Sequence, residues 1–185
     1  MSGLPLIWFA LFMANVSDEI VGEFIDALVN DRQRAEVLLS AQPDLLNARW
    51  MHDETVVHFL AVEGFLDAVT FLAERGADLN LVNEFGDVPL IDIAALGFND
   101  VAEVLLRHGA DPNVRAGSAG RFNALDCGVR AGNSVLVEML LRAGASAIYV
   151  TDLGETIFDV LPESRNDRGK ILAVLARYGH KPGTG

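Results

Sequence analysis

Cys127 is the single cysteine of the sequence, and Asp126 precedes it directly. A cysteine acts as a nucleophile when a base such as histidine is placed to take its proton. No histidine lies near Cys127 along the chain, so we expect this residue to be a small packing residue. An enzymatic function would require chemistry around Cys127 and Asp126 that no neighbouring residue supports.

The four histidines do not form a pattern of metal ligands. His52 and His58 lie six residues apart across a turn that leads into an apolar run, His108 precedes Gly109, and His180 lies near the end of the chain. Structural metal sites gather several ligands at short and regular spacings. We therefore predict no metal site and no cofactor.

Two pairs of adjacent carboxylates, Asp18-Glu19 and Asp53-Glu54, each precede an apolar run. Negative charge is favourable at the start of a helix because of the helix dipole, so these pairs do not require acid–base catalysis. Residues 117–120 are rich in glycine, but they lack the Lys-Ser/Thr ending of a phosphate-binding loop. We predict no catalytic residue.

A ten-residue segment recurs along the chain. Residues 71–80 (FLAERGADLN) return as residues 104–113 (VLLRHGADPN), and in a weaker form as residues 139–147 (MLLRAGASA). A unit of about 33 residues that repeats in one chain is typical of stacked modules, each of which buries its apolar face on its neighbours.

Glycines mark the ends of the helices in each unit. One series closes the longer amphipathic runs, and a second series follows the shorter runs between them. Glycine adopts a positive φ at little steric cost, so the first series is predicted to occupy the position just after a helix end. The first series is Gly76, Gly109, Gly144 and Gly179, and the second is Gly64, Gly97 and Gly132.

Two successive units resemble the ankyrin repeat, whose consensus contains a T-P-L-H-x-A core. The matching residues are 55–61, 64, 76–78 and 80 in the first unit, and 86, 89–90, 94, 97, 105–106, 108–111 and 113 in the second. The resemblance implies an all-α fold, an ankyrin-type α-solenoid of stacked helix-turn-helix units with short hairpin-like loops. It also places His58 at a hydrogen-bonding position at the start of a helix.

The remaining units are degenerate. Residues 123–126 (NALD) and 156–159 (TIFD) replace the T-P-L-H segment, and residues 37–47 match the end of a divergent earlier unit that begins near Ser17. Where the threonine and histidine are lost, we expect looser joints, and we expect Pro162 to end one first helix early. We predict about five repeats over residues 18–180, a flexible tail at 181–185 and a separate apolar segment at 1–17.

Composition limits the classes of partner. The formal net charge is -12, and only Lys170 and Lys181 are lysines. Phosphate recognition and binding to anionic lipid both depend on Lys and Arg, so we predict no nucleic-acid partner and no attachment to a membrane by charge. A lone cysteine cannot form an intrachain disulfide, which favours a cytoplasmic protein.

The N-terminal segment contains thirteen residues without a charge, 4–16 (LPLIWFALFMANV). It is too short to span the hydrocarbon core as a helix of about 20 residues, and no basic residue precedes it as in a signal peptide. Three interpretations remain open: a helix that covers the first repeat, translation that begins at Met13, or a segment for membrane binding, secretion or partner docking.

In proteins that resemble this one, partners are held by the hairpin tips and the exposed positions of each first helix, which line a concave groove. Transferring those positions gives a candidate set of His52, Glu54, Glu63, Glu84, Phe85, Asp87, Leu96, Arg121, Phe122, Arg130, Asp152, Leu153 and Glu155. Aromatic anchors among carboxylates predict a basic protein or peptide partner. The same carboxylates would also keep the array soluble without any role in binding.

The leading prediction is a non-enzymatic, monomeric ankyrin repeat protein that mediates protein–protein interaction through an acidic concave face and hairpin tips. Such a protein would be an adaptor, an inhibitor or an immunity-type binder that blocks a partner's surface. The alternative is a membrane-associated or exported repeat protein anchored by residues 4–16.

Overall fold

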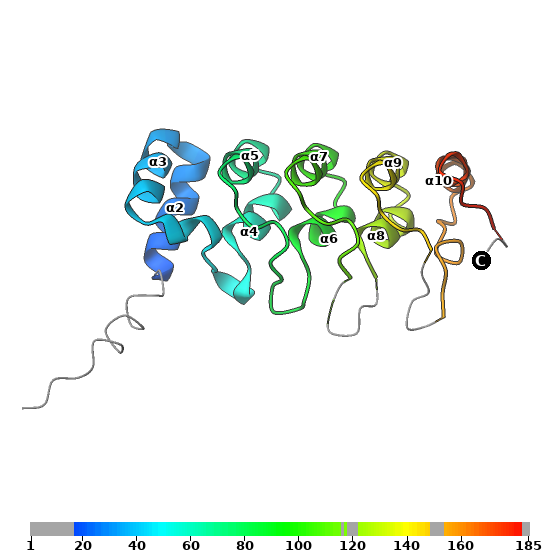
Figure 1. Ribbon diagram of the computed structural model, residues 1–185, viewed down its shortest axis with the longest axis horizontal. Coiled ribbons are helices and arrows are strands. Elements are labelled where there is room, and N and C mark those ends of the chain that lie inside the picture. The colour runs from blue at the N-terminus through cyan, green and yellow to red at the C-terminus, as the bar shows by residue number, and fades with distance from the viewer. Residues whose placement is uncertain (1–16, 116, 118–121, 149–153, 183–185) are drawn as a thin grey trace, which may run out of the picture.

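The computed structural model describes residues 17–115, 117, 122–148 and 154–182. The described residues form helices, turns and two isolated β-bridges, without a named strand, so the predicted all-α class is confirmed. The longer helices form one row, and the short helices lie beneath them in a second row (Figure 1). The first row contains α3 (Arg32–Ala41), α5 (Leu66–Glu74), α7 (Asn99–Arg107), α9 (Ser134–Arg142) and α10 (Arg165–Arg177), and the second contains α4 (Val56–Val62), α6 (Pro89–Ala94) and α8 (Ala124–Arg130).

The first unit differs from the others in having a long first helix. This helix, α2 (Asp18–Asn30), packs on α3, and two short 3-10 turns follow at Pro43–Asn47 and Met51–Asp53. The Ser17 side chain caps α2 by accepting from the Ile20 N–H at 3.5 Å. The first described helix therefore begins directly after Ser17.

From α4 onward, helices pack on the equivalent helices of the next unit. The contacts run from α5 to α7, from α7 to α9 and from α9 to α10 in one row, and from α4 to α6 to α8 in the other. The buried apolar side chains form one continuous cluster that extends from Val21 in α2 to Leu175 in α10. The core is therefore shared along a line of units, as the recurrence in the sequence predicts.

Glycine ends the helices of the longer row. Gly109, after α7, has a φ of 97°. Its N–H donates to the Leu106 carbonyl at 3.3 Å, and the Ala110 N–H donates to the Leu105 carbonyl at 3.0 Å. This pair of bonds closes the helix and requires a positive φ, which glycine adopts without strain. Gly144 has a φ of 94° in the equivalent position, so the predicted role of this glycine series is confirmed.

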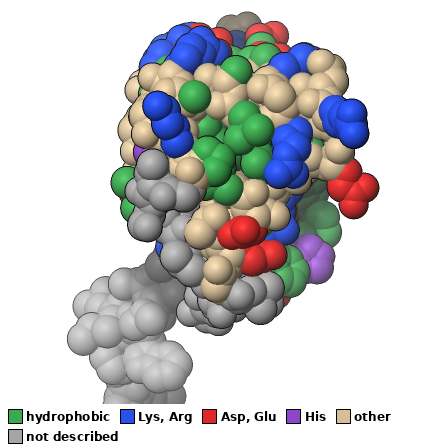
Figure 2. All heavy atoms as spheres, turned by 90° about the vertical axis from the view of Figure 1, so that its right-hand side faces the viewer, with side chains coloured by type: hydrophobic (Ala, Val, Ile, Leu, Met, Phe, Trp, Pro, Cys, Tyr) green, Lys and Arg blue, Asp and Glu red, His purple; other side chains and the backbone are tan. Residues whose placement is uncertain are grey.

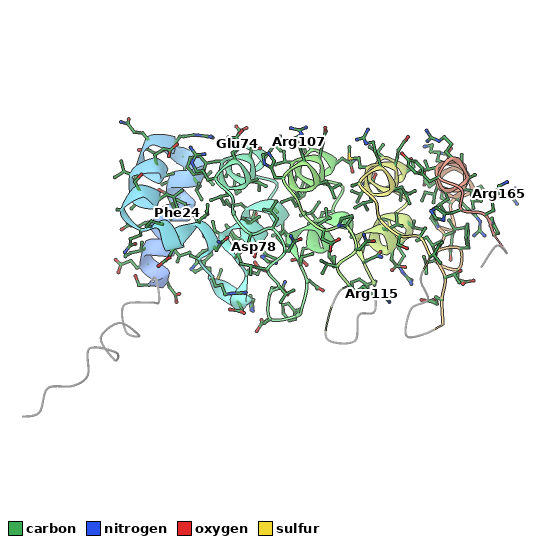
Figure 3. All side chains as sticks on the ribbon, in the orientation of Figure 1. Phe24, Glu74, Asp78, Arg107, Arg115 and Arg165 are labelled. Atoms are coloured by element: carbon green, nitrogen blue, oxygen red, sulfur yellow. The ribbon has the colours of Figure 1, made fainter. Side chains whose placement is uncertain are left out.

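A row of asparagine side chains ties successive units together. The Asn80 side chain accepts from the Asp111 N–H at 2.8 Å and donates to the Gly109 carbonyl at 3.2 Å. Asn113 repeats both bonds with Ser146 and Gly144, and Asn47 accepts from the Asp78 N–H between the first two units. We call these three residues the asparagine ladder; Figure 3 labels Asp78 at one of its joints.

The last unit lacks two features of the others. Ile148 occupies the next ladder position, 35 residues after Asn113, and its side chain is 80% exposed. Turns replace the first helix at residues 157–160, so the expectation of a first helix shortened by Pro162 is wrong. Ile157 and Val160 remain buried in these turns, because α10 still needs an apolar surface beneath it.

None of the described helices is both long and apolar enough to cross a membrane. The segment at residues 1–16, for which three interpretations are open, lies outside the described residues.

Candidate functional site

The first two hairpin tips meet at His52 and Glu84. The His52 Nδ1 lies 2.6 Å from the Glu84 Oε1, and the Glu84 N–H donates to the His52 carbonyl at 3.1 Å. The rings of His52 and Phe85 face each other at a tilt, with their centroids 6.3 Å apart. Three members of the candidate set, drawn from two units, therefore form one contiguous surface.

Large apolar side chains are exposed on these tips. Phe85 is 62% exposed, Met51 is 55% exposed and Val82 is 42% exposed. We call Met51, His52, Val82 and Phe85 the tip patch. The sequence did not predict Met51 and Val82, because their exposure depends on the path of the turn and no residue pattern marks it.

Arg49 fixes the geometry of the tip patch. Its Nη1 binds the Asp53 carboxylate at 3.0 Å and the Val82 carbonyl at 2.7 Å, so one guanidinium joins two hairpins. His52 and Asp53 both have positive φ values, 57° and 55°. Residues other than glycine rarely adopt this backbone conformation, and the contacts of Arg49 hold the turn in it.

The second and third tips approach closely enough to require glycine. The Gly117 N–H donates to the Gly86 carbonyl at 3.2 Å. Gly86 has a φ of 83°, and a Cβ at this position would lie 2.9 Å from the Cα of Gly117. A larger residue at Gly86 would therefore both strain the turn and push the two tips apart.

His58 links the second unit to the third below the tips. The Thr55 backbone N–H donates to the His58 Nδ1 at 3.2 Å, which leaves the proton on Nε2 to donate to the Asp87 carbonyl at 3.0 Å. Burial lowers the pKa of His58 and keeps the ring neutral. The helix-start role that the resemblance implied for His58 is confirmed.

Three carboxyl groups gather beside this link, and we call Glu54, Asp87 and Asp92 the carboxylate cluster. Burial raises the pKa of Glu54, and Glu84 nearby raises it further. Burial, with the negative charges of Asp87 and Glu54, raises the pKa of Asp92 to about 7. The amide of Asn83 donates to the Asp92 carboxyl at 3.3 Å. A positive charge brought to this cluster would be attracted by several groups at once.

Arg130 and Glu155 form a pair with each other, one from the fourth unit and the other from the last. The Arg130 Nη2 lies 2.8 Å from the Glu155 Oε2, and its Nε lies 2.9 Å from the carboxylate of the buried Asp126. The sequence predicted Arg130 and Glu155 as separate contacts to a partner, but in the structure the two side chains bind each other within one intramolecular network. Asp126 was not predicted as part of this network, because it occupies the repeat position that His58 holds in an earlier unit.

The joint at Asp126 has its own cap. Asn123 precedes α8, and its side chain accepts from the Asp126 N–H at 2.9 Å. The polar contact that threonine and histidine supply in the earlier unit is therefore replaced by other residues, and the expected looser joint stays untested.

The other candidate residues vary in exposure. Leu96 is 52% exposed and Glu63 is exposed at the end of α4, whereas Phe122 is half-buried against the core. Phe85 is therefore the more accessible of the two predicted apolar anchors. Arg121, Asp152 and Leu153 lie outside the described residues.

The surface carries no constellation for catalysis among the described residues. Burial, with the charge of Asp126, raises the pKa of Cys127 to about 12, so its thiol stays protonated at neutral pH. Within the described ranges, histidine, cysteine and carboxylate side chains do not form a group that could hold a metal ion.

Comparison with known proteins gives one family. A family model described as "Ankyrin repeats (3 copies)" matches residues 22–116 and, in a second placement, 57–152. The chain is 36% identical to cyclin-dependent kinase 4 inhibitor B of Mus musculus over 120 residues, 65% of this chain and 86% of that protein. It is 40% identical to the Homo sapiens protein of the same name over 85 residues, 46% of this chain and 60% of that protein. A serine/threonine-protein kinase of Arabidopsis thaliana, VIK, is 32% identical over 80 residues, 43% of this chain and 18% of the kinase.

Proposed function

The chain belongs to the ankyrin repeat family, and we propose that it is a non-enzymatic module that binds another protein through its hairpin tips and first-helix face. The partner we infer is a basic protein or peptide. The tip patch supplies the apolar contact, and the carboxylate cluster with Glu84 supplies the charge that selects the partner.

The tip patch is the observation that supports this proposal most strongly. Phe85, Met51 and Val82 are all more than 40% exposed although they are large and apolar. Exposed apolar side chains grouped in one place, as distinct from scattered ones, are typical of a binding surface. Arg49 and the His52–Glu84 contact fix the patch before any partner arrives, which lowers the entropy cost of binding.

Charge supports a basic partner. Asp87 and Glu54 lie close enough to Asp92 for their negative charges to raise its pKa, and the whole chain has a formal charge of -12. Complementary charge speeds association and disfavours acidic competitors, while the aromatic anchor provides most of the affinity.

The names of two relatives favour an inhibitor over a passive adaptor. The mouse and human proteins are inhibitors of a protein kinase by name. We infer that this chain likewise blocks a functional surface of its partner, and a protein kinase is the first class of partner to test.

Charge and size changes on the tips test the proposal. A triple variant, Glu84→Gln/Phe85→Ala/Asp87→Asn, removes an anchor and two charges from exposed or half-buried positions. Glu74→Gln is the matched control, because Glu74 is exposed and points outward from α5 on the far row of helices (Figure 3). Both are compared with the wild type in affinity capture at low salt, followed by mass spectrometry.

We expect the triple variant to recover at least about tenfold less of the specific partner, because it loses one strong hot-spot contact. We expect no change in recovery for Glu74→Gln. Circular dichroism confirms folding of each variant. Equal recovery of every captured protein by all three chains would refute binding through the tips.

We place the protein in the cytoplasm, and the alternative is a repeat protein anchored to a membrane. The uncharged residues 4–16 favour the alternative. Fractionation of the full chain beside a version that begins at Met13 separates the two: cytoplasmic location predicts both in the supernatant, and anchoring predicts only the shorter chain there.

A further inference from the structure

The end of the stack at α10 presents a second surface of opposite character. Leu172 and Ala176 occupy the positions of Val137 and Leu141, which lie 35 residues earlier in α9. Val137 and Leu141 are fully or almost fully buried, and α9 packs against α10. In α10 the equivalent Leu172 is only half-buried and Ala176 is exposed. The equivalent positions of α10 are thus apolar and accessible.

Basic side chains flank these positions. Viewed from the α10 end, hydrophobic side chains occupy the centre of the surface, Lys and Arg side chains stand above and on both sides of them, and Asp and Glu side chains lie below and at the right edge (Figure 2). Arg165 projects from this end of the stack (Figure 3), and Arg168 follows it one turn later. Lys170 and Arg177 pair with Asp167 and Glu138, whereas no ion pair involves Arg165 or Arg168 within the described part of the chain.

We propose that this end face, formed by Arg165, Arg168, Leu172 and Ala176, binds an acidic amphipathic helix of a partner protein. The partner's apolar stripe packs on Leu172 and Ala176, and its carboxylates pair with the two arginines. The surface lies at the opposite end of the chain from the tip patch and takes a partner of opposite charge, so it is independent of the proposed function.

The arrangement of the stack indicates a helix as the occupant. Every helix of the longer row packs on another helix, α7 on α9 and α9 on α10, so a helix laid on α10 would continue the same packing. Ala176 stands where α9 has Leu141, and a small residue allows a close approach of the two backbones. α10 has 13 residues, so a partner helix of three to four turns, about 20 Å long, would match it.

Charge indicates an acidic occupant. α10 carries four basic residues and one acidic residue, within a chain of formal charge -12. An acidic helix is therefore repelled by most of the molecule and attracted to this end, which fixes where it binds.

Two designed peptides test the proposal on the full chain. Both form amphipathic helices with the same Leu and Ala stripe, and one carries Glu and the other Lys on the flanks. Binding is measured by fluorescence anisotropy at low salt and located by NMR chemical shifts. The test variant is Arg165→Glu/Arg168→Glu, and the control is Arg107→Glu/Arg142→Glu, which makes the same charge change at exposed positions of α7 and α9.

The expected result is binding of the Glu peptide with shifts confined to residues 157–182. The test variant should weaken it at least tenfold, and the control should change it by less than twofold. The proposal is overturned if the Glu peptide fails to bind, if it binds the test variant as well as the wild type, or if the Lys peptide produces the same shifts.

Discussion

Asp92 is the residue whose chemistry depends most on its surroundings. Its carboxyl is half-buried beside Asp87 and Glu54, and its pKa rises from the ordinary 3.8 to about 7. Because the folded state prefers the protonated form, this group contributes stability that is fully present below about pH 4 and is lost as the pH rises through 7.

Asp92→Asn should therefore stabilise the protein at high pH. Asparagine keeps an oxygen for the Asn83 amide and never ionises. Because solvent reaches the carboxylate and screens the effect, we expect a gain in unfolding free energy of about 1–2 kcal/mol at about pH 8 and a smaller gain at about pH 5. Urea denaturation of both proteins at the two pH values measures it. Asp67→Asn, at an exposed helix start, is the control and should give a slight loss. A gain for Asp92→Asn that is equal at both pH values would contradict the assigned cause.

Cys127 should be unreactive in the folded protein. With a pKa of about 12, its thiolate population at neutral pH is smaller than that of a free cysteine by about three orders of magnitude. Alkylation by iodoacetamide should thus be slow in buffer and fast in urea, as followed by mass spectrometry. Rapid alkylation of the native chain would reopen an enzymatic role for the Cys127–Asp126 pair.

Individual residues were predictable where the repeat fixes them. His58 and the helix-ending glycines hold the places that the pattern gives them, and Phe85 proved exposed at a tip. The pairing of Arg130 with Glu155, 25 residues further on, was not predictable, because it depends on how two units pack. The exposure of Met51 was not predictable, because it depends on the turn at His52 and Asp53, whose backbone has a rare conformation with positive φ.

At the scale of elements, the asparagine ladder joins the central units to one another but does not extend to the last unit. Asn80 and Asn113 each make two bonds to the following unit, whereas Ile148 has no side-chain amide to offer to α10. The last unit should therefore open more readily than the central ones.

Ile148→Asn should repair this joint. By analogy with the bond from Asn113 to the Gly144 carbonyl, we expect the new amide to donate to the Gly179 carbonyl. It should stabilise the last unit by about 0.5–1.5 kcal/mol, the net value of a hydrogen bond. Amide exchange in α10 should slow accordingly. Asn113→Ala serves as the reciprocal control and should accelerate exchange in α9 and α10. The ladder account fails if Asn113→Ala accelerates exchange while Ile148→Asn has no effect in α10.

The sequence predicted the helices of the central units and missed the turns at residues 157–160. Ile157 and Val160 have a spacing that fits either a helix or a turn, and the segment is buried in both cases. Local pattern does not decide between them. Thr156 and Asp159 favour the turn, because the Asp159 carboxylate accepts from the Thr156 N–H at 2.8 Å and from its hydroxyl at 2.7 Å.

The whole molecule is a line of units, so damage should stay local. Leu105 and Leu140 are fully buried in α7 and α9. Leu105→Ala or Leu140→Ala should each cost about 2–5 kcal/mol by leaving a cavity. Hydrogen exchange should accelerate in the altered unit and its neighbours and much less at α2, because each unit contacts only the next. A uniform loss of protection from α2 to α10 would indicate one cooperative core.

The central claim is that the binding surface consists of the hairpin tips and the row of short helices α4, α6 and α8. A hydrogen-exchange footprint with the captured partner tests this claim most directly. The account predicts slower exchange at residues 49–55 and 82–88 and in α4, α6 and α8, with α5, α7 and α9 unchanged. Protection centred on α5, α7 and α9, with the tips exchanging as freely as before, would contradict it.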